Sequence, residues 1–166
     1  PTRTVYTNTG LMYYYTGRFD LAVEMQQRAV ELAPEDHRIW GRLAESARFV
    51  TGMEEQSQLA YQRAYELATV RLRINPRDAD TIGHLALYAA HLGKHAETDA
   101  LLVRGFDVAR DDPDMHYFAA LVAIDEGLES HPDSRKLRLI KARLLAQRGE
   151  TGPAIELLQA ITARPP

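Results

Sequence analysis

The chain has 166 residues, of which 45% are hydrophobic and 26% are charged, with no cysteine and a formal net charge of -3. This balance fits one folded domain of ordinary size and argues against a disordered chain. It excludes disulfides and cysteine-ligated metal sites, and the small negative charge gives no general attraction to nucleic acid or to anionic membranes.

Regularly placed glycines and small residues indicate an internal repeat. Five glycines each follow a stretch with apolar residues at helical spacing: Gly17, Gly52, Gly93, Gly127 and Gly149. A small residue lies seven or eight positions before each of them: Gly10, Ala44, Ala86, Ala120 and Ala142. The small residue allows a second helix to approach closely, and the glycine ends the first helix because it accepts a left-handed conformation.

In chain order, these positions divide a single domain of residues 1–166 into five units. The units cover about 3–35, 36–77, 78–112, 113–132 (truncated) and 133–164. Prolines that cannot continue a helix follow the second helices of the first three units, and an acidic residue within two positions of each proline favours the start of the next helix.

Two units depart from the regular pattern. From Gly52 to Pro76 is 24 residues, against 17 from Gly17 to Pro34, so the second helix of the second unit should be about two turns longer. The fourth unit is too short for a hairpin and predicts one unpaired helix at 115–129. We therefore expect about nine helices and no strand.

The repeated pattern resembles the tetratricopeptide repeat family. The first unit carries the family's spaced positions: Tyr6, Gly10, Tyr13, Gly17, Phe19, Ala22, Ala29 and Pro34. The second, third and last units carry shorter versions, so the resemblance covers nearly the whole chain. It implies an all-α, right-handed superhelix of helical hairpins, whose first helices line a concave groove. The segment at 29–52 is also similar to tetratricopeptide regions attached to bacterial kinases, adenylate cyclases and winged-helix regulators.

The helical register predicts which side chains face that groove. They lie one, four or five places after each small residue, with Arg38 at the rim. The predicted partner-binding residues are Leu11, Tyr14, Tyr15, Arg38, Glu45, Arg48, Phe49, Leu87 and His91. Tyr15, Phe49 and His91 would form an aromatic ladder, and tyrosine and arginine are favoured interface anchors. The alternative is that these aromatic side chains pack against neighbouring units.

Two specific chemistries are disfavoured. The family's clamp for a C-terminal carboxylate uses lysine and asparagine, and this chain has Thr7, Leu11, Arg42 and Asp80 at those places. His91 and His95 are four residues apart, but Gly93 breaks the helix between them, so we expect a solvated turn and no metal site. There is no glycine-rich phosphate loop, GxSxG or HExxH motif.

The sequence therefore predicts a non-enzymatic adaptor or scaffold that binds another protein or peptide, in the setting of a regulatory domain of a larger bacterial protein. We expect no cofactor, no nucleic-acid partner, no membrane insertion and a cytoplasmic location. Because the chain begins at Pro1, we expect a fragment or a processed form.

Two alternatives stay open. One is self-assembly through the C-terminal hairpin, which carries Ile155, Leu158 and Ile161. The other is the non-catalytic part of a signalling enzyme such as a kinase or a cyclase.

Overall fold

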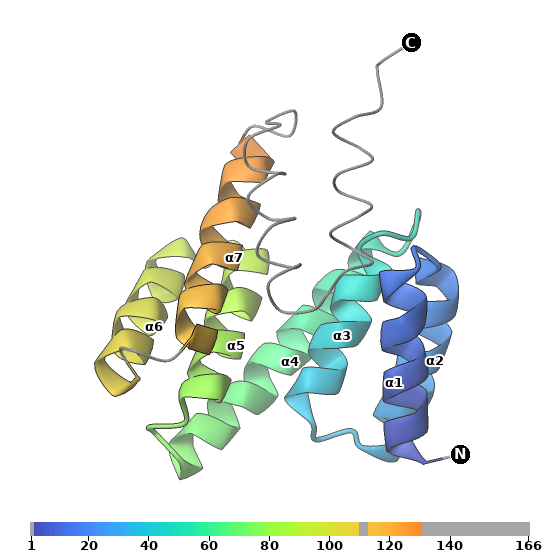
Figure 1. Cartoon of the computed structure of the whole chain (residues 1–166), viewed down its shortest axis with the longest axis horizontal. Helices are drawn as coiled ribbons and strands as arrows, with labels where there is room; N and C mark the ends of the chain where they lie inside the picture. Colours follow the sequence, from blue (N-terminus) through green and yellow to red (C-terminus); the bar gives the residue numbers. More distant parts are fainter. Residues whose placement is uncertain (1, 110–112, 131–166) are drawn as a thin grey trace.

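The computed structural model describes residues 2–109 and 113–130, and within these residues the chain forms seven α-helices and no strand (Figure 1). The helices are α1 (Arg3–Tyr15), α2 (Phe19–Leu32), α3 (His37–Ala47), α4 (Glu54–Ile74), α5 (Ala79–His91), α6 (His95–Val108) and α7 (Pro113–Ser130). The all-α class is confirmed. The helices expected in 133–164 lie outside the described residues.

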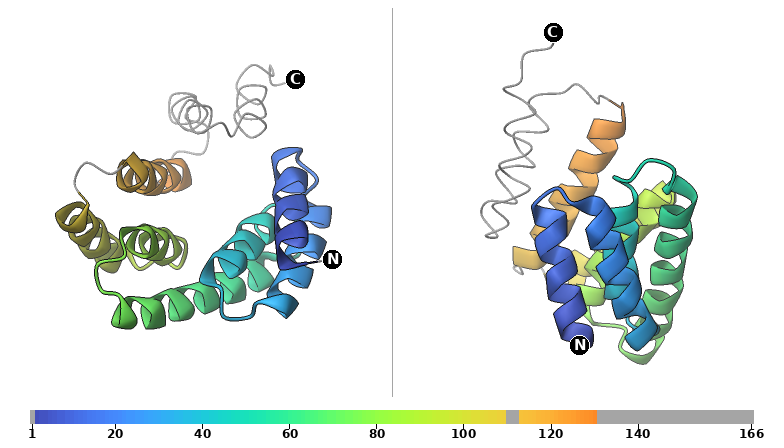
Figure 2. Two further views of the ribbon diagram at one scale, coloured as in Figure 1. Left: turned by 60° about the horizontal axis from the view of Figure 1, so that its bottom comes forward. Right: turned by 90° about the vertical axis from the view of Figure 1, so that its right-hand side faces the viewer.

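Consecutive helices pair as hairpins, and the hairpins follow one another along an arc. The pairs α1–α2, α3–α4 and α5–α6 each form a hairpin, and α7 packs mainly on α5. Figure 2 shows α1, α3, α5 and α7 on the inner side of the arc and α2, α4 and α6 on the outer side. The first helices therefore line a concave face, as expected for a solenoid of helical hairpins.

Glycine ends the first helix of each of these hairpins. Gly17, Gly52 and Gly93 have φ values of 71°, 84° and 69°, the left-handed conformation that other residues adopt at a cost. Gly127 differs, because the single helix predicted at 115–129 is present as α7, which continues through Gly127 to Ser130. A glycine inside a helix costs only about 1 kcal/mol relative to alanine, so it does not stop a helix unless the chain must also reverse.

Aspartates begin two of the inner helices, as the sequence predicted. Asp36 is the N-cap of α3, where its side chain accepts a hydrogen bond from the backbone N–H of Arg38 at 3.1 Å. Asp78 caps α5 in the same way, through the N–H of Thr81 at 3.2 Å. The predicted length difference is also present, since α4 has 21 residues and α2 has 14.

Small residues bring neighbouring helices into close contact. Ala44 and Ala86 are fully buried, and the buried core continues from Val23 of α2 to Leu101 of α6. Glycines on inner helices lie beneath large side chains of the next inner helix: Gly41 of α3 is covered by Tyr88, and Gly83 of α5 by Phe118 of α7. These contacts set the spacing of the concave wall.

Candidate partner-binding groove

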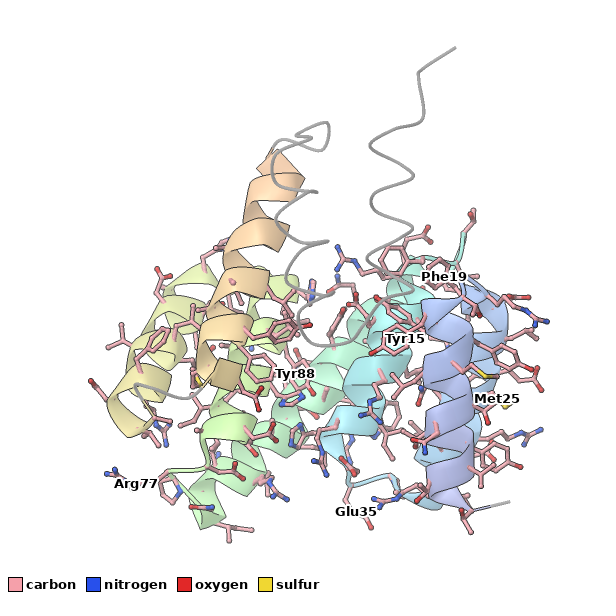
Figure 3. All side chains as sticks on the ribbon, in the orientation of Figure 1. Tyr15, Phe19, Met25, Glu35, Arg77 and Tyr88 are labelled. Carbon is pink, nitrogen blue, oxygen red and sulfur yellow. The ribbon has the colours of Figure 1, made fainter. Side chains whose placement is uncertain are left out.

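The concave face contains a cavity of about 430 Å³, called the groove below. It is lined by α1, α3, α5 and α7, with single contributions from α2 and α4. The lining residues are Leu11, Tyr14, Tyr15, Gln26, Arg38, Gly41, Arg42, Glu45, Ser46, Tyr61, Asp80, His84, Leu87, Tyr88, His91, Asp114, Tyr117, Phe118 and Leu121. In Figure 3, Tyr15 and Tyr88 lie toward the centre of this face, on opposite sides of α3. The wall is therefore rich in tyrosine.

Seven of the nine predicted site residues line the groove: Leu11, Tyr14, Tyr15, Arg38, Glu45, Leu87 and His91. Their role in binding stays a prediction. Arg48 and Phe49 are not part of the lining. Arg48 is the C-cap of α3, and its guanidinium pairs with Glu45 at 3.6 Å and lies 5.5 Å from the centre of the Phe49 ring.

The predicted ladder of Tyr15, Phe49 and His91 does not form. Helix α3 ends at Ala47, so Phe49 is past the point where helical spacing applies. Its ring instead stacks on Phe19 at the start of α2, with a centroid distance of 4.7 Å, and remains 47% exposed. His91 stacks on Tyr61 of α4 at 4.5 Å.

A polar cluster holds the floor of the groove together. The carboxylate of Glu45 accepts a hydrogen bond from the Tyr14 hydroxyl at 2.9 Å and another from the Tyr61 hydroxyl at 2.5 Å. Arg48 Nη1 and His91 Nε2 lie 3.6 Å and 3.8 Å from Oε2 of the same carboxylate. The Glu45 cluster thus joins α1, α3, α4 and α5, and both of its tyrosine hydroxyls are already engaged as donors.

Burial sets the protonation state of Tyr14 in this cluster. Burial, with Glu45 beside it as the next contribution, raises the pKa of Tyr14 well above its usual value. Tyr14 is therefore a neutral donor at physiological pH and fixes the orientation of the carboxylate.

A second buried group joins α3 and α5. The Tyr88 hydroxyl donates to the backbone oxygen of His37 at 3.2 Å, and His37 Nδ1 is 3.3 Å from the same hydroxyl. Burial lowers the pKa of His37 to about 4, so its imidazole is neutral at pH 7. His84 Nδ1 lies 3.4 Å from the carboxylate of Asp80 beside them, and the rings of His84 and Phe118 have a centroid distance of 4.7 Å.

A second, smaller cavity of about 210 Å³, called the N-terminal cavity below, shares two lining residues with the groove. It is lined by Arg3, Thr4, Thr7, Asn8, Asp36, Arg38, Ile39 and Arg42. Three guanidinium groups therefore face one carboxylate. Arg38 and Arg42 line both cavities. The loss of solvent around Arg42 lowers the pKa of its guanidinium, which still remains charged at neutral pH.

Some lining residues were missed from the sequence. Tyr61 comes from a second helix, and no rule of position along the first helices can find it. Arg42 had a local signal, because it lies four residues after the predicted Arg38 and shares its helical face. Tyr88 was missed because it lies only two places after the small residue Ala86.

Two kinds of feature are absent from the part of the chain that the structure describes. No group of three or more His, Asp or Glu side chains in residues 2–109 and 113–130 is arranged to hold a metal ion. In the same part of the chain, no helix is long and apolar enough to cross a membrane. The His91 and His95 pair is separated by the left-handed turn at Gly93.

One comparison with known proteins, the match to a family model, supports the family resemblance. Residues 4–36, which cover all but the first residue of α1, the whole of α2 and the loop before α3, match the tetratricopeptide repeat family model. The chain is similar to the solved structure of MamA AMB-1, with 16% identity, a TM-score of 0.47 and coverage of 94% of this chain and 95% of that one. It is similar to MamA MSR-1 with 19% identity, a TM-score of 0.44 and coverage of 95% and 97%. No curated protein matches the chain.

Proposed function

Since the first hairpin of the chain is a tetratricopeptide repeat, we propose that the protein is an interaction scaffold that takes a peptide segment of a partner protein in its concave groove. The groove itself carries this proposal. It joins residues of four inner helices into one cavity, and no single hairpin provides it. Aromatic and arginine side chains are the residues that most often dominate protein interfaces, and both types line this cavity.

The groove is also built to keep its shape before a partner arrives. Tyr14 and Tyr61 hold Glu45 from two sides, and Tyr88 is hydrogen-bonded to His37. A wall fixed in this way loses little side-chain entropy on binding, which favours affinity. Leu11 and Leu87 are half-buried and contribute apolar contact area beside the fixed tyrosines.

The self-assembly alternative depends on residues 153–163, which lie outside the described residues. Within the described part of the chain, the exposed large apolar side chains are distributed over several helices, from Val5 of α1 to Val103 of α6. The groove is therefore the better-supported surface. The division into units and the setting within a larger bacterial protein stay predictions.

Site-specific photocrosslinking tests the proposal. A benzophenone amino acid replaces Leu87 in the groove, and in a matched variant it replaces Leu59, which is 64% exposed on the outer helix α4. Both variants are irradiated in lysate of the source organism. The expected result is a discrete partner adduct from position 87 that is absent from position 59 and is reduced by Tyr15→Ala. Equal adducts from both positions, or adducts only from position 59, would rule out the groove as the binding surface.

A further inference from the structure

The N-terminal cavity contains a charged group that its surroundings leave unmatched. Arg42 is half-buried on the inner side of α3, and within residues 2–109 and 113–130 its side chain makes no hydrogen bond or ion pair. A guanidinium group removed from water costs free energy unless hydrogen bonds or an opposite charge replace the lost hydration. Among the described residues, no hydrogen bond or ion pair offsets this cost at the edge of the groove.

The nearby carboxylates are engaged elsewhere. Asp36 is the single acidic residue in the lining of the N-terminal cavity, and its two oxygens accept from Arg3 at 3.1 Å and from Arg38 at 3.4 Å. Asp80, on the groove side, has His84 Nδ1 at 3.4 Å from its carboxylate. The three arginines of the cavity therefore exceed its carboxylates by two charges.

We propose that Arg42 is the binding site for an aspartate or glutamate side chain of the partner segment that lies in the groove. This inference rests on the proposed function, because it identifies the chemistry of the segment that the groove takes. A guanidinium group matches a carboxylate with two parallel hydrogen bonds, which gives both affinity and a fixed register. Asn8, exposed on α1 in the same lining, adds a side-chain amide donor.

The position of Arg42 also connects the acid to apolar anchors. Arg42 lines both cavities, so a segment with its acidic side chain at Arg42 lies beside the groove. There it meets Leu11, Tyr15 and Leu87. The expected partner motif is an acidic residue followed or preceded by apolar residues, within the interior of a segment and without a requirement for a free C-terminus.

Selection of displayed peptides tests the motif and does not require an identified partner. Short random peptides are displayed through their C-termini, so that no terminal carboxylate is exposed, and are selected on the full chain. Parallel selections use Arg42→Gln and, as the matched control, Arg63→Gln. Arg63 is exposed on α4 and is ion-paired with Glu66. Urea unfolding of each variant shows that it is folded, and Arg42→Lys keeps the charge without the bidentate geometry.

The wild-type and Arg63→Gln selections should enrich Asp or Glu at one fixed position beside apolar residues. The Arg42→Gln selection should lose the acidic position and keep the apolar ones. In fluorescence anisotropy, a Glu→Gln change in a selected peptide should weaken binding to the wild type about tenfold to a hundredfold and leave binding to Arg42→Gln unchanged. Arg42→Lys should recover part of the difference.

The outcomes separate the two proposals. Two results overturn the proposal that Arg42 binds a carboxylate and leave the groove proposal standing. One is selected peptides with no preference for an acidic residue, and the other is the same preference for an acidic residue on Arg42→Gln. If the preference for an acidic residue is also lost on Arg63→Gln, the proposal that Arg42 binds a carboxylate is overturned, because that result indicates general charge attraction. If no peptide is selected on any variant, both proposals fail.

Discussion

The contact between Gly41 and Tyr88 gives the sharpest test of how the inner helices are spaced. A Cβ atom on Gly41 would lie 2.6 Å from Cε1 and from the hydroxyl oxygen of Tyr88, and 2.9 Å from Cζ. Carbon atoms attract at about 3.5–4 Å and repel strongly at these shorter distances. The ring has little freedom to move away, because it is 2% exposed and its hydroxyl is hydrogen-bonded to His37. In Gly41→Ala, α3 and α5 must therefore separate or Tyr88 must leave its site.

Two opposing terms decide the size of the effect. Overpacking a core costs about 1–3 kcal/mol. Alanine in place of glycine inside a helix stabilises the fold by about 1 kcal/mol. We expect Gly41→Ala to lower the free energy of unfolding by up to about 2 kcal/mol, measured by urea unfolding followed by far-UV circular dichroism.

A double-mutant cycle isolates the contact. In the Tyr88→Leu background the atoms that would clash are gone, so Gly41→Ala should become neutral or stabilising by about 1 kcal/mol. The reasoning is refuted if Gly41→Ala changes the free energy of unfolding by the same amount in both backgrounds. That result would mean that the Tyr88 ring does not lie over Gly41.

Three further predictions concern the groove and its supports. Tyr15→Ala should reduce the yield of the position-87 crosslink about tenfold with unchanged stability. Phe49→Ala should leave that yield unchanged and lower the urea midpoint, because Phe49 packs on Phe19 outside the groove. The opposite pattern would identify Phe49 as a binding residue. His37 has a pKa of about 4 in the fold against about 6.5 in the unfolded chain, so stability is fully present above pH 6.5 and falls by about 2–3 kcal/mol as the pH drops toward 4. His37→Gln should flatten that part of the curve of unfolding free energy against pH, and an unchanged slope would contradict the assignment. Ala44→Leu should cost about 1–3 kcal/mol, since Ala44 is fully buried in the second hairpin, and an unaltered melting temperature would count against the register.

Features with a local cause were predictable from the sequence. Gly17, Gly52 and Gly93 end helices because a single residue provides the left-handed turn, and Asp36 and Asp78 begin helices because a side chain satisfies a nearby N–H. These interactions are complete within a few residues, so the sequence contains them in full.

Features that depend on where a helix ends, or on another hairpin, were not predictable in the same way. The groove register was right within a helix, as at Leu11, Tyr15 and Leu87, and wrong at Phe49, two residues past the end of α3. The bond from Tyr61 to Glu45 joins residues 16 positions apart on different helices, and its geometry follows from how α3 and α4 pack. Periodicity along one helix carries no information about that packing.

The structure divides the concave face into side chains that build it and side chains that remain available for a partner. Tyr88 and Phe118 line the groove, yet each also covers a glycine of the neighbouring inner helix and so fixes the distance between helices. Replacing them changes stability and groove shape together, and a loss of binding in such variants says nothing about contact with a partner. The Arg42 side chain supports neither a glycine contact nor an ion pair among the described residues. An effect of Arg42→Gln on binding, without an effect on stability and without the same effect in Arg63→Gln, is therefore the informative result, because it separates a direct contact with the partner from general charge attraction.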